Sequence, residues 1–300
     1  MIKLKPDFLV GSYPPITTPF RDGKVDLDTY AKLLEFQVQN GTHGIVVNGT
    51  TSEPSTLTID ERNQLVKCAV EVIGKRIPVV AQTGSQSHAE TVELTEFATK
   101  AGADALLVVT PYYIRPSQRG LVAYYDDIGK RTDLPILLYH IPGRTAVSVD
   151  IDTLQQISDK VDHFVGIKHA VNDHGFVTSM IQTLGPEFRI FVGLEEFTYP
   201  MMALGAHGTM NAVANLVPDR IAALCNATLA GDMKESRRLH FDLYGLNQSI
   251  FYDTNPIPLK YMMKRLGIVE HNEHRLPMLP ATPELEKRLD EVLKRAGLIL

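Results

Sequence analysis

The chain has 300 residues, of which 44% are hydrophobic and 22% are charged, and its formal net charge is −5. These values are typical of a globular protein and exclude a largely disordered chain. A mildly acidic balance gives no general attraction to nucleic acid or to an anionic membrane surface. The length allows either one large α/β barrel or two ordinary domains.

The first residues and the two cysteines indicate the compartment. The short apolar run near the N-terminus is broken by Gly11 and two prolines, which does not fit a signal peptide. No stretch approaches the roughly 18 apolar residues of a membrane span. Cys68 and Cys225 belong to no Cys-x-x-Cys or Cys/His cluster, which favours reduced thiols over a disulfide or a zinc site. We therefore expect a cytoplasmic protein.

Apolar, β-branched runs alternate with amphipathic segments along the chain. Most runs are continuous, as expected of parallel strands that are covered on both faces. The eight runs are 11–17, 43–48, 77–83, 103–110, 134–141, 164–168, 189–193 and 208–214. Eight strands that are each followed by a helix predict an α/β fold, a single (β/α)₈ TIM barrel. The alternative is a doubly wound open sheet, which the absence of Gly-x-Gly-x-x-Gly after the first run disfavours.

Several helix boundaries are also predicted. Capping residues are expected at Asp26, at Thr58 with Glu61, and at Ser87 with Glu90. Glycines are expected to end helices at Gly41, Gly102 and Gly205.

The C-terminal part of the chain continues the helical pattern. We expect the barrel to occupy residues 1–225 and C-terminal helices packed on it to occupy 226–300, as one structural unit. Thr282 followed by Pro283 is typical of a helix start. The apolar face of that last helix would consist of Leu285, Leu289, Val292, Leu293 and Ala296.

In a barrel of this kind the active site lies at the C-terminal ends of the strands. Lys168 ends an apolar run, where lysine is rare unless it is paired or used. A buried lysine that is present as the free amine can attack a ketone and form an iminium, which acts as an electron sink. The alternative is a structural lysine whose ammonium reaches solvent or Glu195.

Other polar residues follow neighbouring runs. Tyr139 and Tyr113 could relay protons, although strand tyrosines are often packing residues. Thr50 and Thr51 follow a glycine in a turn, where hydroxyls and amides can hold a carboxylate. Arg144 lies in a loop and could bind a carboxylate with both its terminal nitrogens, or simply be solvated. No His-Glu-x-x-His spacing is present, so we expect no metal or cofactor. A metal-dependent aldolase is kept as the second hypothesis.

Together these residues resemble the dihydrodipicolinate synthase/N-acetylneuraminate lyase family of class I Schiff-base aldolases, over nearly the whole chain. The motifs that carry the resemblance are Gly49-Thr-Thr-Ser-Glu53, Thr110-Pro-Tyr-Tyr-x-x-Pro116, Leu138-Tyr-x-x-Pro142, Gly166-Ile-Lys168 and Asn255-Pro-x-Pro-x-Lys260.

The resemblance implies roles for particular residues. It places the catalytic residues at Lys168, Tyr139, Thr50 and Tyr113, and the substrate-binding residues at Thr51, Arg144, Gly193 and Met210. Lys168 would form a Schiff base with pyruvate, Thr51 would hold the pyruvate carboxylate, and Arg144 would bind a small carboxylated aldehyde. Tyr113 would act in a neighbouring subunit, so the resemblance implies a homotetramer, built as a dimer of dimers.

The chain also departs from the family pattern. Ser52 stands where glycine is usual, His169 where glutamate is usual, Glu195 where aspartate is usual, and Asn211 where serine is usual. Ile59, Arg62 and Gln86 differ from the lysine-feedback residues of some bacterial synthases. These departures favour the same pyruvate chemistry with another aldehyde.

Three functions remain open from the sequence. The chain looks most like synthase-related proteins assigned as 2,4-dihydroxyhept-2-ene-1,7-dioate aldolases, which release pyruvate and succinic semialdehyde. The alternative within the family is a dihydrodipicolinate synthase, which condenses pyruvate with aspartate semialdehyde. The alternative of another class is a barrel that binds a keto acid without catalysis.

Overall fold

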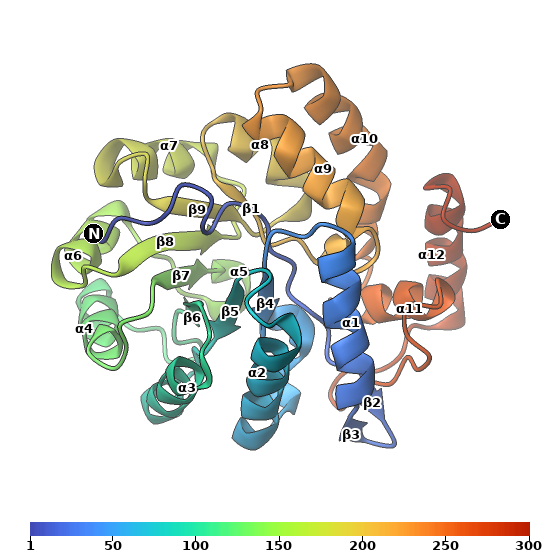
Figure 1. Cartoon of the computed structure of the whole chain (residues 1–300), viewed down its shortest axis with the longest axis horizontal. Coiled ribbons are helices and arrows are strands. Elements are labelled where there is room, and N and C mark those ends of the chain that lie inside the picture. Colours follow the sequence, from blue (N-terminus) through green and yellow to red (C-terminus); the bar gives the residue numbers. More distant parts are fainter.

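Eight parallel strands form a barrel at the centre of the computed structural model, which describes all 300 residues (Figure 1). The strands are β1 (Gly11–Ser12), β4 (Ile45–Val47), β5 (Val79–Gln82), β6 (Ala105–Val109), β7 (Ile136–His140), β8 (Phe164–His169), β9 (Arg189–Val192) and β10 (Gly208–Thr209). They are paired in the order β1-β10-β9-β8-β7-β6-β5-β4. A bridge between Pro15 and Val46 joins the two ends of this order. The predicted (β/α)₈ barrel is therefore confirmed.

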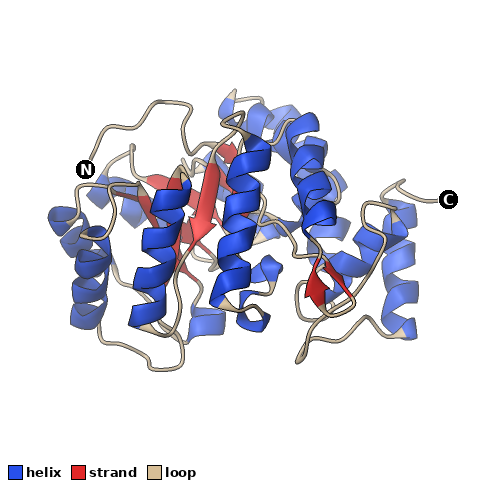
Figure 2. Cartoon of the chain, turned by 60° about the horizontal axis from the view of Figure 1, so that its bottom comes forward, coloured by secondary structure: helices blue, strands red, loops and turns tan.

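Helices surround the strands (Figure 2). They are α1 (Leu27–Gln39), α2 (Ile59–Ile73), α3 (His88–Ala101), α4 (Gln118–Gly129), α5 (Pro142–Thr145), α6 (Ile151–Lys160), α7 (His174–Leu184), α8 (Thr198–Ala203), α9 (Pro218–Leu229), α10 (Met233–Ser249), α11 (Ile257–Arg265) and α12 (Pro283–Arg295). Short 3₁₀ helices are η1 (Thr50–Ser52), η2 (Pro54–Thr56), η3 (Glu195–Phe197) and η4 (Ala212–Asn215). None of the helices carries an apolar stretch that is long enough to cross a membrane.

The first and last predicted strands are shorter than expected. In the run 11–17, two consecutive prolines lack the N–H that a regular ladder requires, and only two residues pair with β10. In the run 208–214, the side chain of Asn211 accepts a hydrogen bond from the Val213 amide at 2.7 Å. This local bond starts η4, so the chain turns where a continued strand was expected.

The predicted helix boundaries agree with the structure, with one exception. Asp26 caps α1, Thr58 and Glu61 form a complete capping box on α2, and the three glycines follow the ends of α1, α3 and α8. Ser87 caps α3, but the Glu90 carboxylate accepts a hydrogen bond from the Ser85 hydroxyl at 2.6 Å instead of bonding to the Ser87 backbone. The predicted capping box on α3 is therefore only half formed. Thr282 caps α12, and the predicted apolar face of α12 packs on the core.

A β-hairpin that the sequence analysis did not predict lies outside the barrel. Its strands are β2 (Phe20–Arg21) and β3 (Lys24–Val25), and both views place it near the C-terminal helices. The guanidinium of Arg275 donates to the Gly23 carbonyl and also to both carboxylate oxygens of Glu61. The segment before α12 is thus fastened to the hairpin and to α2.

Side chains on most of the strands alternate between two apolar layers. On β7, Leu137 and Tyr139 belong to the cluster inside the barrel, whereas Ile136 and Leu138 belong to the layer between strands and helices. This alternation follows from the pleat of the strand. It places His140 on the outer face, next to the residue that follows Lys168 on β8.

His140 and His169 form a buried pair on this outer face. Their Nδ1 atoms are 3.2 Å apart, and both rings stack near Phe176 of α7. The Val149 amide donates to His140 Nε2 at 3.3 Å, so the proton of neutral His140 lies on Nδ1 and is donated to His169. Burial, and for His140 also its histidine neighbour, lowers the pKa of each ring to about 4.

We predict that this pair makes the fold sensitive to acid. Between about pH 6.5 and 4 the unfolded chain binds protons that these rings do not bind in the folded state, so stability falls as the pH falls through this window. His169→Gln removes one of these titrating rings, so the free energy of unfolding should fall less steeply with decreasing pH, by up to about 1.4 kcal/mol per pH unit. Urea unfolding across this range measures it, with exposed His271→Gln as control. Profiles of equal slope in the wild type and His169→Gln would contradict the prediction.

The C-terminal helices share one continuous core with the barrel. The boundary that we expected between residues 225 and 226 falls inside α9, which is a single helix. Further along, Lys260 of α11 is fully buried and donates to Glu53 Oε1 at 2.9 Å and to the Thr18 carbonyl at 3.1 Å. His274 lies 3.4 Å from the other oxygen of Glu53. A buried ion pair therefore joins the extension to the turn that follows β4.

We predict that removing one partner of this ion pair destabilises the protein more than replacing both partners. Lys260→Met leaves the Glu53 carboxylate buried without its ammonium, which should cost about 3–5 kcal/mol of unfolding free energy. Lys260→Met combined with Glu53→Gln should cost less than the single change, because no uncompensated charge remains. Urea denaturation at neutral pH measures both. Lys130→Met breaks the exposed pair with Asp126 and should cost at most about 1 kcal/mol. A double variant less stable than Lys260→Met would refute this account.

Candidate active site

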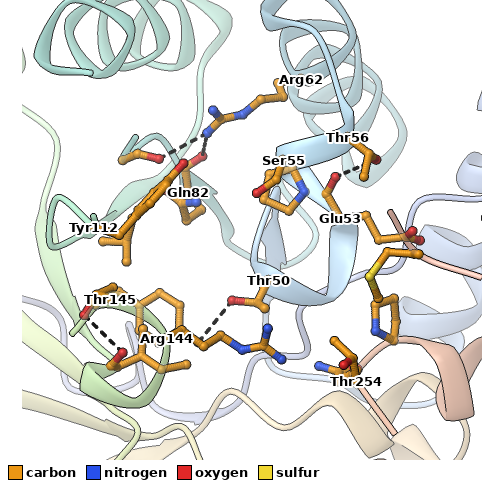
Figure 3. Close-up of a pocket in the computed structure, with 18 of the residues that line it drawn as sticks. Thr50, Glu53, Ser55, Thr56, Arg62, Gln82, Tyr112, Arg144, Thr145 and Thr254 are labelled. Atoms are coloured by element: carbon orange, nitrogen blue, oxygen red, sulfur yellow. Dashed lines mark hydrogen bonds between the residues drawn. The ribbon is translucent and has the colours of Figure 1, made fainter. Parts of the chain in front are cut away.

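A pocket of about 330 Å³ opens beside the C-terminal ends of the strands. Its walls come from the turn after β4, the ends of β5, β6 and β7, helix α5 and two C-terminal segments. Figure 3 shows Arg62 and Gln82 at one end of this pocket and Arg144 and Thr254 at the other. The location is the one expected for the active site of a (β/α)₈ enzyme.

Lys168 and Tyr139 lie side by side at the base of this region. Their Cα atoms are partners in the pairing of β7 with β8, so both side chains point into the barrel. The Lys168 ammonium lies 4.4 Å from the centre of the Tyr139 ring, and only 3% of Lys168 is exposed. The Tyr139 hydroxyl is 3.3 Å from the Thr50 hydroxyl. The structure thus brings together three of the four residues predicted to be catalytic.

Gly193 provides the room that Lys168 needs. It follows β9, and a Cβ atom at this position would lie 3.0 Å from Lys168 Cε and 2.8 Å from the Ala170 Cβ. Any larger residue would push on the lysine side chain. Gly193 therefore shapes the space around the amine.

Thr51 and Met210 lie behind the pocket surface. Both are buried, and Met210 belongs to the same interior cluster as Tyr139. The Thr51 hydroxyl accepts a hydrogen bond from Asn255 Nδ2 at 3.1 Å. Neither residue lines the pocket of this single chain, and the same holds for Lys168 and Gly193. Lys168 lies next to the lining residue Tyr139, and Thr50 and Tyr139 line the pocket directly.

Arg144 points into the pocket from the short helix α5. Its side chain is exposed and makes no hydrogen bond or ion pair within the chain. An unpaired guanidinium can bind a carboxylate through two parallel hydrogen bonds. Arg144 is thus free to receive an acidic group at the mouth of the pocket.

Tyr113 is the one predicted catalytic residue that lies apart from the others. It is 91% exposed, and its φ of +70° turns the chain away from the end of β6. The preceding residue, Tyr112, lines the pocket instead. In a single chain Tyr113 does not meet Tyr139, and its expected role in a neighbouring subunit stays a prediction.

The departures from the family motifs mostly face away from the pocket. The Ser52 hydroxyl donates to the Ile16 carbonyl at 2.5 Å, His169 packs on the outer face of β8, and Asn211 caps η4. None of these three lines the pocket. Arg62, another of the departures, does line it, so the departures as a group do not decide which aldehyde is bound.

Glu195 is a buried carboxyl group close to this region. Its Oε1 accepts from the Ala212 amide at 2.9 Å, and its Oε2 has no partner. Burial raises its pKa to about 7, while Lys168 acts in the opposite direction. Glu195 does not line the pocket, but the same is true of Lys168, with which Glu195 interacts electrostatically.

Sequence reasoning missed part of the pocket. Arg62 was noted only as a departure, yet it is buried there and donates to the Gln82 carbonyl at 3.2 Å. Burial lowers the pKa of this guanidinium to about 10. Asn255 was part of a motif without an assigned role, and Met278 carried no sequence signal at all. Both lie more than 200 residues from the Thr50 turn in sequence.

Comparisons with known proteins agree with one another. The model of the dihydrodipicolinate synthetase family matches residues 9–296. A 4-hydroxy-tetrahydrodipicolinate synthase of Thermus thermophilus is 42% identical over 290 residues, which cover 96% of this chain and 97% of the relative.

Two solved structures extend this likeness to the fold. The crystal structure of dihydrodipicolinate synthase from Aquifex aeolicus has a TM-score of 0.95 and 39% identity, covering 97% of this chain and 99% of the other. The chloride-inhibited dihydrodipicolinate synthase of Acinetobacter baumannii, complexed with pyruvate, has a TM-score of 0.92 and 36% identity, covering 97% of this chain and 99% of the other.

These relatives support the family resemblance but not the branch of 2,4-dihydroxyhept-2-ene-1,7-dioate aldolases that the sequence analysis favoured, since the relatives carry the name of the synthase. The family match spans nearly the entire chain, and the identities are well above 30% over that length. The chain belongs to the dihydrodipicolinate synthetase family and is a class I aldolase, an enzyme of the lyase class.

Proposed function

We propose that the protein condenses pyruvate with aspartate semialdehyde through a Schiff base on Lys168, as a 4-hydroxy-tetrahydrodipicolinate synthase. The observation that carries this proposal is the buried Lys168 amine beside Tyr139, whose hydroxyl meets Thr50 at the pocket. The names of the relatives, and the pyruvate in the Acinetobacter baumannii structure, support the choice of substrates.

The first half of the reaction forms the enamine. The free amine of Lys168 attacks the ketone carbon of pyruvate, whose carboxylate is held by Thr51. Tyr139 protonates the departing hydroxyl, so that water leaves and an iminium forms. Thr50, 3.3 Å from the Tyr139 hydroxyl, passes protons between Tyr139 and the pocket. Loss of a proton from the methyl carbon then gives the enamine.

The second half joins the two substrates. The enamine carbon attacks the aldehyde, and the carboxylate of the aldehyde substrate binds the free guanidinium of Arg144. The amino group of the bound substrate then replaces Lys168 at the former ketone carbon, which closes the ring and releases the lysine. Every proton that is taken up or released in these steps passes through hydroxyl groups of the pocket or through water.

The choice of aldehyde rests on the relatives more than on the pocket. Succinic semialdehyde and aspartate semialdehyde both carry a carboxylate, so Arg144 suits either. Ser52, His169 and Asn211, which suggested a different aldehyde, do not line the pocket. The name that the relatives share favours aspartate semialdehyde.

We also propose that the protein works as a homo-oligomer, most simply the tetramer that the family resemblance implies. Tyr113 lies on a protruding loop with Ile114, and both side chains are largely exposed in the single chain. An exposed tyrosine and isoleucine side by side suit an interface. In such an assembly Tyr113 would reach the relay of a neighbouring subunit.

The Schiff base is tested by trapping. Borohydride reduction of the wild type with pyruvate should add one pyruvate-derived adduct per chain, located on Lys168 by peptide mapping. Lys168→Ala should lose both the adduct and turnover, whereas Lys160→Ala, which changes an exposed lysine, should retain both. A chelator should leave the wild-type rate unchanged. Turnover in folded Lys168→Ala, or loss of activity to the chelator, would exclude the mechanism in favour of a metal-dependent aldolase.

The aldehyde site is tested at Arg144. Arg144→Ala should raise the KM for aspartate semialdehyde by about 10- to 100-fold, the worth of a hydrogen-bonded charge, without changing the pyruvate concentration that half-saturates trapping. Arg119→Ala, an exposed arginine outside the pocket, is the control. A wild type that turns over succinic semialdehyde but not aspartate semialdehyde would instead support a 2,4-dihydroxyhept-2-ene-1,7-dioate aldolase. A wild type that traps pyruvate and turns over neither aldehyde would favour the non-catalytic barrel.

A further inference from the structure

The hydroxyl of Thr51 is oriented by a residue from the far end of the chain. Asn255 Nδ2 donates to the Thr51 oxygen at 3.1 Å. A hydroxyl has one hydrogen and two lone pairs, so a threonine that accepts from an amide keeps its hydrogen for another partner. Asn255 itself lines the pocket, next to Thr254. The Thr51 hydrogen is thus available to an acceptor in the active-site region.

The turn around Thr51 is held at a second point by the same C-terminal segment. Glu53 has a φ of +57°, a left-handed conformation that is unfavourable for a residue with a side chain. Its buried carboxylate is bound by Lys260, and His274 lies against its other oxygen. A buried ion pair contributes little net stability compared with apolar packing, so its presence favours a positional role.

The two contacts come from one short stretch of chain. Asn255 lies two residues before the first residue of α11, and Lys260 lies in the first half of that helix. They contact the turn at Thr51 and at Glu53, two residues apart. The residue between these, Ser52, is bonded to the Ile16 carbonyl. The turn is therefore fixed from two sides, and Asn255, in the segment that leads into α11, orients the Thr51 hydroxyl.

We propose that Asn255 is a positioning residue for pyruvate, which holds the Thr51 hydroxyl as a hydrogen-bond donor to the substrate carboxylate, with the Lys260–Glu53 pair holding the turn in place. This inference rests on the proposed function, since it assigns the pyruvate carboxylate to Thr51. It gives the C-terminal extension a part in substrate binding. Asn255 orients Thr51 and need not touch the reacting atoms.

The test compares two substitutions at one position. Asn255→Ala removes the donor and lets the Thr51 hydroxyl rotate, so the pyruvate concentration that half-saturates borohydride trapping should rise about 3- to 10-fold. Asn255→Asp replaces the donor by an acceptor, which draws the Thr51 hydrogen away and adds a charge of the same sign as pyruvate. Its half-saturating concentration should rise further, to at least about tenfold above the wild type.

Further measurements separate positioning from general damage. For Asn255→Ala the KM for the aldehyde and the melting temperature should stay near the wild-type values, and a saturating amount of pyruvate should restore full trapping. Asn226→Ala is the matched control, because the Asn226 side chain makes one hydrogen bond, to His43, and lies outside the pocket lining. It should leave the half-saturating pyruvate concentration unchanged.

The outcomes distinguish this inference from the proposed function. If the wild type itself traps no pyruvate, the proposed function fails, and the inference falls with it. If the wild type traps pyruvate and both Asn255 variants half-saturate at the wild-type concentration, the inference alone is wrong. It is also wrong if Asn255→Asp binds pyruvate better than Asn255→Ala, or if both variants lose trapping only in proportion to a fall in melting temperature.

Discussion

The site depends on the pairing of β7 with β8. Tyr139 and Lys168 are partners in this parallel pair, so their Cα atoms stand opposite each other and their side chains leave the sheet on the same side. A shift of one residue in either strand would turn one of them outward, because side chains alternate between faces. Buried apolar neighbours inside the barrel, such as Leu137 on β7 and Phe191, the partner of Lys168 on β9, help to hold this register. The closeness of amine and phenol is thus a result of strand pairing rather than of any direct bond between them.

The remaining parts of the site are held by contacts that are distant in sequence. Thr50 and Thr51 lie on a 3₁₀ turn, which by itself has few internal bonds to fix its position. Asn255 and Lys260 supply the missing constraints from the C-terminal extension, and Arg275 fastens the segment before α12 to Glu61. A barrel supplies rigid strand ends, while its loops need such external support. The C-terminal extension therefore contributes to the structure of the site in addition to packing on the barrel.

Much of the fold could be predicted from the sequence, because buried parallel strands and helix caps leave local patterns. The positions of Lys168 and Tyr139 at strand ends followed from the same patterns. The ends of the first and last strands could not be predicted from the pattern. Two prolines, which lack an N–H, shorten the first strand, and a hydrogen bond to the Asn211 side chain ends the last one. Arg62, Asn255 and Met278 were not assigned to the pocket, because only the closed barrel brings them together. Tyr113 is exposed in the single chain, and its role in a neighbouring subunit stays a prediction.

The same alternation shows why a motif departure next to a catalytic residue in sequence need not reach the substrate. His169 follows Lys168 directly, and in a strand this adjacency means the opposite face: its ring packs on His140 and α7, away from the pocket. Ser52 follows Thr51, but its hydroxyl is bonded to the first strand segment. A change at a residue next to a catalytic residue in sequence can therefore alter packing on the outer face of the barrel and leave the active site unchanged. Specificity should instead be sought in residues whose side chains reach the pocket, such as Arg144, and these can only be recognised once the face of each strand is known.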